Sequence, residues 1–514
     1  MKKIYFAVAL FITFQAYTQA PTKVWDSTIG GSNYDFASEI VATNDGGFVV
    51  VGYSLSRISG DKTEASRGNY DYWIVKLNSA GQKVWDKTIG GSDYDYPLSV
   101  VATTDGGFVV VGYSSSGISG DKTEASKGSD DCWVVKLNSA GQKVWDKTIG
   151  GSGPDYAKSV VATNDGGFVV AGDSFSGISG DKTEASKGSY DYWVVKLNSL
   201  GQIVWDKTIG GSGNEFGVAI VATNDGGFVV AGYSPSGISG DKTEASKGSN
   251  DYWIVKLNSL GQIVWDKTIG GSGDDKAYSL VAANDGGFVV VGSSPSGISG
   301  DKTEASRGVE DYWVVKLNST GQKVWDKTIG GIGNDQPSSV VATNDGGFVL
   351  AGISISGISG DKTEASKGCN DFWMVKLNSL GQIVWDKTIG GSNCDNYPSI
   401  AATNDGGFVV AGGSDSGISG DKTQASKGVS DYWIVKISDG SCPNTLTPTG
   451  TITTNQKAAN TVITVVGNAG SGTLNIIPNS ANVIYQAGNY VLLNPGFVAN
   501  NSSIFTAKIL AGCN

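Results

Sequence analysis

A carboxylate recurs once in each of seven similar segments of this 514-residue sequence, three residues after a Gly-Gly-Ser or Gly-Gly-Ile motif. The seven residues are Asp35, Asp95, Asp155, Glu215, Asp275, Asp335 and Asp395. At the mouth of a central channel they would supply the clustered oxygen ligands that hard cations prefer. Each would equally well accept backbone N–H bonds and fix its own loop. A residue that recurs in every segment usually meets a structural need that all segments share, and this favours the second interpretation. We therefore expect no cofactor and no metal, with calcium as the alternative.

A second acid lies in a Gly-Asp-Lys-Thr motif that every segment carries. These residues are Asp61, Asp121, Asp181, Asp241, Asp301, Asp361 and Asp421. A lysine follows each aspartate and the spacing differs from that of calcium-binding loops, so we expect the motif to brace a loop. A third acid, Asp71 and its equivalents, precedes a tryptophan by two positions and is interpreted as a turn acceptor.

The sequence contains no histidine. This absence removes the usual general base, the Ser-His and Cys-His nucleophile pairs and the commonest zinc ligand. Glycoside hydrolysis by two carboxylates would need one acid made different by its surroundings, and near-identical segments offer no such asymmetry. We therefore expect that the protein is not an enzyme. The alternative from another class is a polysaccharide hydrolase or lyase that uses carboxylates at the channel mouth.

Tryptophan defines the period of the sequence. Two series of seven tryptophans each keep an interval of 60 residues, which is the mark of a repeat architecture. The first series is Trp25, Trp85, Trp145, Trp205, Trp265, Trp325 and Trp385. The second series is Trp73, Trp133, Trp193, Trp253, Trp313, Trp373 and Trp433.

Each period contains four short apolar segments separated by turn residues. In the second period they cover residues 84–89, 98–102, 108–113 and 132–137. Glycine-rich turns after the second and fourth segments predict tight hairpins, and the unbroken apolar run in the third segment predicts a strand buried on both faces. Four antiparallel strands per unit are typical of a propeller blade, so we expect an all-β, seven-bladed β-propeller. A β-solenoid is disfavoured by the 60-residue unit.

The segments GGSxxD, SVVATNDGGFVVVGYS and DYWVVKLNSAGQ resemble the repeats of secreted bacterial β-propellers common in Bacteroidetes, over residues 24–437. The resemblance implies that the strand after GGSxxD is innermost in its blade and that VWDKTIGG is outermost. In that order, residues 24–29 complete the last blade beside residues 432–437, since otherwise this blade would expose an open edge. The long insert SGISGDKTEASKG departs from the family pattern.

The chain is expected to contain further parts beside the propeller, which we place at residues 21–438. Residues 439–451 are rich in Thr, Pro and Gly and indicate a linker. Residues 452–514 carry short apolar segments between Gly and Asn, which predict a small all-β domain. Through VIYQAGNYVLLNPGF and the terminal Gly-Cys-Asn this domain resembles the coathanger-stack domain of secreted Bacteroidetes proteins. The resemblance implies a module for secretion or surface display.

Residues 1–20 combine two lysines, an apolar run and small residues, as a secretory signal peptide does. Cleavage after Ala20 or after Thr18 would leave a protein that is secreted or held at the outer surface. The apolar run is too short for a membrane-spanning helix, so we expect no transmembrane segment. The net charge is −11 and no block of Lys or Arg interrupts the repeats, which argues against nucleic acid as a partner. The expected partner is an extracellular glycan or protein.

Disulfide bonds form in the oxidising surroundings that an exported protein meets, and the sequence has five cysteines. Cys369 and Cys394 flank one hairpin and are predicted to pair. Cys442 and Cys513 bracket the C-terminal domain and form a second candidate pair. Cys132 replaces a tyrosine found in most repeats, and we expect it to be buried and free.

Three stretches differ among the otherwise copied segments: the loop after Gly-Gly-Ser, the residues before the insert and those before Asp-Tyr-Trp. In an antiparallel blade, the links that contain them fall on one face of the propeller. Aromatic residues gather in these links, and aromatic rings suit sugar rings and protein hot spots. The candidates are Tyr34, Phe36, Tyr94, Tyr96, Tyr156 and Phe216.

The aromatic face leads us to expect a binding or adhesion protein. Drift in tolerant loops is the alternative explanation of the variation. If the variation is only drift, the alternative function is that of a structural surface protein without a specific ligand.

Overall fold

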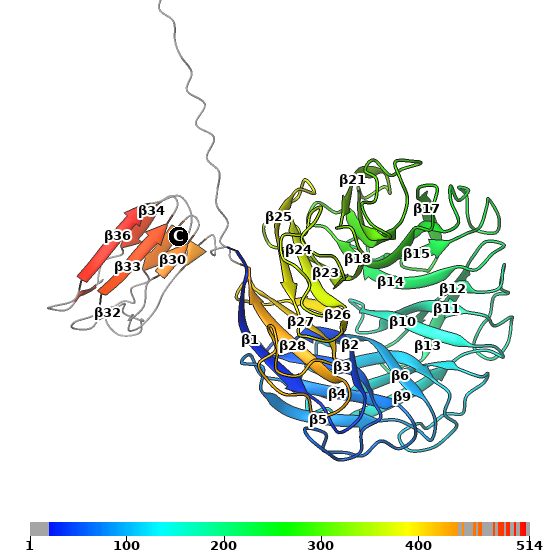
Figure 1. Cartoon of the computed structure of the whole chain (residues 1–514). Helices are drawn as coiled ribbons and strands as arrows, with labels where there is room; N and C mark the ends of the chain where they lie inside the picture. The colour runs from blue at the N-terminus through cyan, green and yellow to red at the C-terminus, as the bar shows by residue number, and fades with distance from the viewer. Residues whose placement is uncertain are drawn as a thin grey trace, which may run out of the picture. The chain divides into compact units, whose positions relative to one another are not determined.

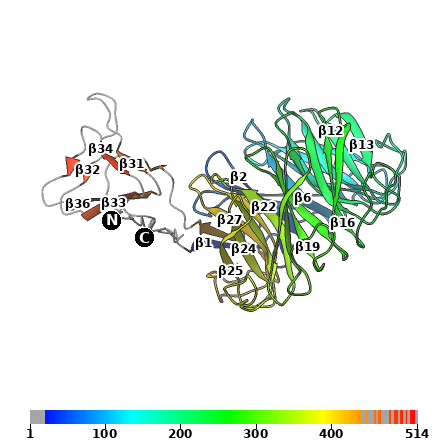
Figure 2. The ribbon, with the colours of Figure 1, turned by 90° about the horizontal axis from the view of Figure 1, so that it is seen from above.

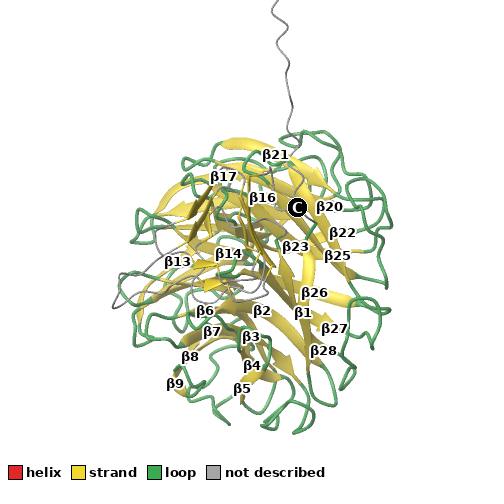
Figure 3. Cartoon of the chain, turned by 90° about the vertical axis from the view of Figure 1, so that its left-hand side faces the viewer, coloured by secondary structure: helices red, strands yellow, loops and turns green. Residues whose placement is uncertain are grey.

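A computed structural model of the protein describes residues 20–439 without a gap, and beyond them short strands between residues 445 and 509. Residues 23–437 form one compact unit, and residues 1–22 with 438–514 form another. The described residues contain strands and loops and no helix (Figure 3). The expected signal peptide lies almost wholly outside the described residues.

The first unit is a seven-bladed β-propeller with four antiparallel strands in each blade (Figures 1 and 2). From the centre outwards, blade 1 consists of β2 (Asp35–Ala42), β3 (Phe48–Ser54), β4 (Asp71–Leu77) and β5 (Lys83–Ile89). The next five blades follow the same order. Their strands are β6 (Asp95–Ala102), β7 (Phe108–Ser114), β8 (Asp131–Leu137), β9 (Lys143–Ile149), β10 (Asp155–Ala162), β11 (Phe168–Ser174), β12 (Asp191–Leu197), β13 (Ile203–Ile209), β14 (Phe216–Ala222), β15 (Phe228–Ser234), β16 (Asp251–Leu257), β17 (Ile263–Ile269), β18 (Lys276–Ala282), β19 (Phe288–Ser294), β20 (Asp311–Leu317), β21 (Lys323–Ile329), β22 (Asp335–Ala342), β23 (Phe348–Ser354), β24 (Asp371–Leu377) and β25 (Ile383–Ile389).

Blade 7 joins the two ends of the repeat region. Its strands are β26 (Asp395–Ala402), β27 (Phe408–Ser414), β28 (Asp431–Ser438) and, on the outside, β1 (Thr22–Ile29). Figure 1 shows β1, in blue, beside β28, in orange. Asp26 on β1 accepts hydrogen bonds from the backbone N of Thr423 at 2.9 Å and from Trp433 Nε1 at 3.2 Å. The predicted closure of the ring by the first strand is confirmed.

The turns and the buried strands agree with the sequence pattern. Gly106 and Gly141 have φ angles of 79° and 75°, a conformation that glycine adopts without steric cost. The third apolar segment of the period forms β7, whose side chains are buried on both faces except for the half-buried Tyr113. The following strand, β8, is buried throughout. Neighbouring blades therefore pack through these two strands.

A tyrosine and a tryptophan join each blade to the next at five of the seven interfaces. At the first of these, Tyr72 Oη donates to the carbonyl oxygen of Trp133 at 3.2 Å, and the two ring centroids are 4.9 Å apart. A Cβ on Gly112 would lie 2.8 Å from Tyr72 Oη, so the glycine before the last two residues of β7 makes room for this hydroxyl. Cys132 and Phe372 take the tyrosine position at the other two interfaces. Cys132 is buried and free, as expected.

The second unit contains short strands that pair in parallel. Described there are β29 (Thr445–Leu446), β30 (Gln456–Ala458), β31 (Thr461–Thr464), β32 (Ile476–Ile477), β33 (Asn482–Ala487), β34 (Tyr490–Leu493), β35 (Val498–Ala499) and β36 (Ile504–Ile509). They form the sheets β29-β31-β34, β30-β33-β36 and β32-β35. Cys442 and Cys513 lie outside the described residues. In the part of the chain that is described, no helix is long and apolar enough to cross a membrane.

Candidate functional site

The seven acids that open the inner strands are buried inside the blades. They are Asp35, Asp95, Asp155, Glu215, Asp275, Asp335 and Asp395. In blade 1, Asp35 Oδ2 accepts hydrogen bonds from the backbone N of Gly31 at 2.6 Å and from Ser56 Oγ at 3.0 Å. The equivalent glycine N–H binds the acid in every other blade. These acids fix their own loops, and none of them is exposed to solvent.

Each of these acids shares its buried surroundings with a lysine and a second aspartate. In blade 1, Lys62 Nζ donates to Thr88 Oγ1 at 2.7 Å and lies 5.4 Å from the ring centroid of Trp73. Burial lowers the pKa of Lys62 to about 8 and raises the pKa of Asp71 to about 6, while the attraction between the charges opposes both shifts. Asp71 Oδ2 also accepts from the backbone N of Arg67, in the role of a turn acceptor.

The long inserts brace one blade against the next. Arg67 from the insert of blade 1 pairs with Asp121 from the insert of blade 2 at 3.0 Å, and Asp121 N donates to the carbonyl oxygen of Gly90 at 2.8 Å. Six further pairs complete a closed belt of seven. They are Lys127–Asp181, Lys187–Asp241, Lys247–Asp301, Arg307–Asp361, Lys367–Asp421 and Lys427–Asp61. The aspartates of the Gly-Asp-Lys-Thr motif therefore brace the inserts of neighbouring blades, in agreement with the role expected from the sequence. No three acidic or cysteine side chains of the described residues converge as a metal ligand set.

Aromatic side chains from blades 1 to 4 form a continuous arc at the end of the propeller that carries the variable loops. We define the aromatic arc as Tyr34, Phe36, Tyr53, Tyr70, Tyr94, Tyr96, Tyr113, Tyr156, Phe175, Tyr190, Phe216 and Tyr233. Centroids of neighbouring rings are between 4.8 Å apart, for Tyr113 and Tyr156, and 6.5 Å, for Tyr156 and Tyr190. All six aromatic residues singled out in the sequence therefore belong to one connected surface.

The arc covers only part of the ring of blades. In blades 5 to 7 the positions of Phe36 and Tyr53 hold polar, aliphatic or glycine residues. These are Lys276, Ser293, Gln336, Ile353, Asn396 and Gly413. A packing need shared by all blades does not explain an arc that stops after the fourth. Tyr34 and Tyr94 are 39% and 42% exposed, so the arc presents ring surface to solvent.

The structure adds residues that the sequence comparison missed. These residues are Tyr53, Tyr113 and Tyr233. In its blade, each lies on the strand that carries the buried valines, so the sequence pattern makes it look like a core residue. Burial raises the pKa of Tyr53 to about 12, so its hydroxyl stays a hydrogen-bond donor at neutral pH. A comparison of the repeats at this position would have identified these residues, because blades 5 to 7 have Ser293, Ile353 and Gly413 in place of the tyrosine.

The arc borders a cavity in the central channel. The cavity has a volume of about 910 Å³ and is lined by the inner strands of all seven blades, including Phe36 and Tyr53 of the arc. Lys158 and Glu39 are the charged side chains of this lining. Lys158 Nζ pairs with the buried carboxylate of Asp173.

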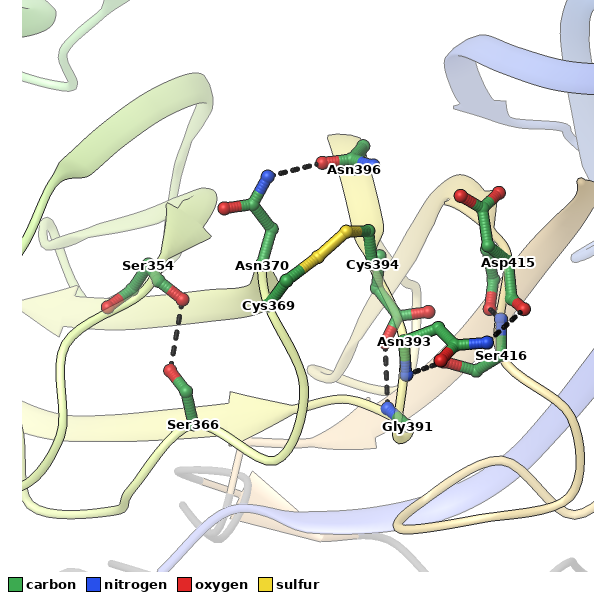
Figure 4. The surroundings of a disulfide bond; sticks show 12 residues. Ser354, Ser366, Cys369, Asn370, Gly391, Asn393, Cys394, Asn396, Asp415 and Ser416 are labelled. Carbon is green, nitrogen blue, oxygen red and sulfur yellow. Dashed lines mark hydrogen bonds between the residues drawn. A yellow bond between two sulfur atoms is a disulfide. The ribbon is translucent and has the colours of Figure 1, made fainter.

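A disulfide joins Cys369, before β24, to Cys394, before β26 (Figure 4). Their Cα atoms are 5.0 Å apart, and the pair is the one that the hairpin argument predicts. Asn370, directly after Cys369, donates a hydrogen bond of 2.7 Å to Asn396, two residues after Cys394. The loop that leads into the inner strand of blade 7 is thereby held to blade 6.

The fold defines a class, the seven-bladed β-propellers with four-stranded antiparallel blades. No family model matches the sequence. The regulatory protein FlaEY of Caulobacter vibrioides is 24% identical over 260 residues, which cover 46% of this chain and 27% of that protein. The uncharacterized WD repeat-containing protein L264 of Acanthamoeba polyphaga mimivirus is 19% identical over 506 residues, which cover 76% of this chain and 36% of that protein. The chain thus spans 27% and 36% of the lengths of these two relatives.

Two solved structures are similar at low sequence identity. Hydrazine synthase of Kuenenia stuttgartiensis is 11% identical, with a TM-score of 0.43, over 79% of this chain and 96% of that chain. A protein of unknown function from Dyadobacter fermentans is 11% identical, with a TM-score of 0.43, over 82% of this chain and 99% of that chain.

Proposed function

We propose that the protein is a binding protein without catalytic activity, secreted or held at the cell surface, whose recognition face contains the aromatic arc. The observation that carries the proposal is the confinement of twelve connected aromatic rings to blades 1 to 4 of an otherwise repeating ring. Large aromatic side chains bind partners well because they bury much apolar area at a low cost in conformational entropy.

A glycan is the ligand that this arrangement suits best. A sugar ring stacks on an aromatic ring through its C–H face, and the neighbouring tyrosine hydroxyls can bond its hydroxyl groups. Rings that already contact one another are held in place before the ligand arrives, which lowers the entropy lost on binding. The signal-like segment at residues 1–20 and the disulfide support an extracytoplasmic setting, where such ligands occur.

The test is an array of plant, algal and bacterial polysaccharides and oligosaccharides, incubated with the purified chain from residue 21 to 514. We expect retention on a subset of the glycans and no new reducing ends or unsaturated products after prolonged incubation. Product formation would make the protein a hydrolase or lyase and overturn the proposal. Failure to bind any glycan, together with capture of a surface protein through the same arc, would replace the glycan with a protein partner.

A further inference from the structure

One position of the channel wall differs in blade 1 from all other blades. Six blades have small residues there, and blade 1 has Glu39. The six are Ser99, Ser159, Ala219, Ser279, Ser339 and Ser399. Four of the five serines link their blade to the next, as when Ser99 Oγ accepts from the backbone N of Val160 at 3.3 Å. Glu39 Oε2 accepts from the equivalent backbone N of Val100 at 2.5 Å. Glu39 thus keeps the link and adds a carboxyl group that the link does not need.

Among the described residues, the carboxyl group of Glu39 has no partner of opposite charge. In the described part of the chain, no lysine or arginine forms an ion pair with Glu39, and the groups that face it from β6 are Ser99 and the N–H of Val100. Lys158, the other charged residue of the cavity lining, is neutralised by Asp173. Burial raises the pKa of Glu39 to about 7, and the two hydrogen bonds from β6 oppose this shift. A cation at this place would remove the cost of the isolated charge.

Tyr397 is a second irregularity in the wall of the same cavity. Its position holds Ala37, Ala157 and Ala277 in blades 1, 3 and 5, and these alanines are buried. A tyrosine does not fit that space. Tyr397 instead has a φ of 54°, the one positive value found among the described non-glycine residues, and its side chain is 67% exposed. Such backbone conformations are unfavourable and gather at functional sites.

Other aromatic rings lie with Tyr397 where β2 begins. Phe36 and Tyr53 line the same cavity, with their ring centroids 5.4 Å apart. The proximity of Tyr397 contributes to the raised pKa of Tyr53, which places the two phenol groups near each other. The disulfide at Cys394 fixes the loop three residues before Tyr397 (Figure 4). Glu39 follows Phe36 by three residues on β2, so the two residues are separated by roughly 10 Å of strand in the wall of the same cavity.

We infer that the channel binds an organic ammonium group, with the cation at Glu39 and the body of the ligand against Tyr397, Tyr53 and Phe36. A carboxylate together with aromatic faces is the combination that recognises such cations, because the ring faces carry partial negative charge. The serine hydroxyls of the neighbouring blades accept hydrogen bonds from an amine. The inference does not rest on the proposed function, because the cavity can bind an amine whether or not the aromatic arc binds a glycan.

The sister blades supply the variants that test this site. Glu39→Ser installs the residue of five other blades and retains an acceptor for Val100 N. Tyr397→Ala installs the residue of blades 1, 3 and 5 and removes the positive φ requirement. Both variants should fold with unchanged or higher melting temperatures, since each returns to the pattern of the repeats. Glu39→Gln, of nearly the same shape as the native side chain, is the second variant for the charge.

The experiment is calorimetric titration of the chain from residue 21 to 514 at pH 8 with two pairs of probes. Choline is compared with 3,3-dimethylbutan-1-ol, and glucosamine with N-acetylglucosamine, so that each cation has a neutral counterpart of similar shape. We expect one site for at least one cation, affinity at least tenfold lower for its neutral counterpart, and a similar loss in Glu39→Ser and Glu39→Gln. Tyr397→Ala should weaken binding three- to tenfold. The pair that responds tells a quaternary ammonium ligand from an amino sugar.

Three results would overturn the inference. They are the absence of binding by both cations, equal binding of cation and neutral counterpart, and unchanged affinity in both Glu39 variants. Binding of choline, whose charge does not change with pH, should also weaken between pH 8 and pH 5.5 in the wild-type chain, because protonation of Glu39 removes the carboxylate charge, and this dependence should be absent from Glu39→Ser. A pH dependence that persists in Glu39→Ser would assign the cation to another group.

Discussion

Replacing Cys132 with tyrosine is expected to stabilise the propeller. At five blade interfaces a tyrosine hydroxyl donates to the carbonyl oxygen of a tryptophan in the next blade. Cys132 occupies this position between blades 2 and 3, so the bond and the ring contact are missing there. The three atoms nearest to a Cβ on Gly172 all belong to the backbone of Tyr156 and Ala157, and no side-chain atom is among them. At the equivalent Gly112 a tyrosine hydroxyl fills this place.

Four contributions set the size of the effect. Burial of the larger side chain stabilises by about 1–2 kcal/mol, the ring pair with Trp193 by about 0.5–1.5 kcal/mol, and the hydrogen bond by about 0.5–1.5 kcal/mol. Strain from a pocket that has closed around the smaller cysteine opposes them by about 1–3 kcal/mol. Taken at the middle of these ranges, the four contributions give a net gain in the free energy of unfolding of about 1.5 kcal/mol.

Urea unfolding followed by tryptophan fluorescence measures this gain. The order of stability should be Cys132→Tyr above Cys132→Phe above wild type, because phenylalanine restores the ring contact without the hydroxyl. Cys132→Ser controls for loss of the thiol. The reciprocal change Tyr192→Cys, at the next interface, should cost about 2–4 kcal/mol. A Cys132→Tyr protein less stable than wild type, together with a Tyr192→Cys protein of wild-type stability, would refute the reasoning.

Three further predictions concern closure, pH and the disulfide. Deleting residues 21–30 removes β1 and opens an edge on blade 7, so thermal unfolding should begin at a sharply lower temperature; an unchanged melting curve would contradict the closure. The pKa of Asp71 is about 6 when folded, above its usual value of about 3.9, so its contribution to stability is fully present below pH 4 and is lost as pH rises through 6. Asp71→Asn should therefore reduce the loss of stability between pH 4 and pH 7 in urea unfolding, and an identical loss in both proteins would show that another group causes it. Replacing Cys369 and Cys394 with serine should lower the free energy of unfolding by about 3 kcal/mol, since the disulfide closes a segment with a sequence separation of 25; peptide mapping without reductant should find the two joined, and free thiols would refute the pairing.

The architecture of the propeller follows from features that a sequence displays directly. The tryptophan interval gives the number of blades, and the glycine-rich turns give four antiparallel strands in each. The place of β1 follows from the need to cover the edge of blade 7. The parallel pairing in the second unit was not predicted, because short strands without hairpin turns leave their partners undetermined.

The sites were harder to predict because burial and direction are properties of the fold. Asp35 and its equivalents could face either a channel or a loop, and only the position of Gly31 N and Ser56 Oγ decides between them. Tyr53 looks like a core residue of a strand until its neighbours in other blades are known. Glu39 is visible as a departure from serine among the repeats, but its place in a channel wall requires the closed ring.

The proposal of a recognition face is tested most directly by comparing two double variants of the chain for binding to a glycan that the array identifies. Tyr34→Ala with Tyr94→Ala removes two exposed rings of the aromatic arc, and Leu200→Ala with Leu260→Ala removes two exposed side chains from turns at the opposite end of the blades. The account predicts a loss of affinity of at least tenfold in the tyrosine variant, wild-type affinity in the leucine variant and similar melting temperatures in both. Equal affinities in the two variants would show that the aromatic arc does not recognise the ligand.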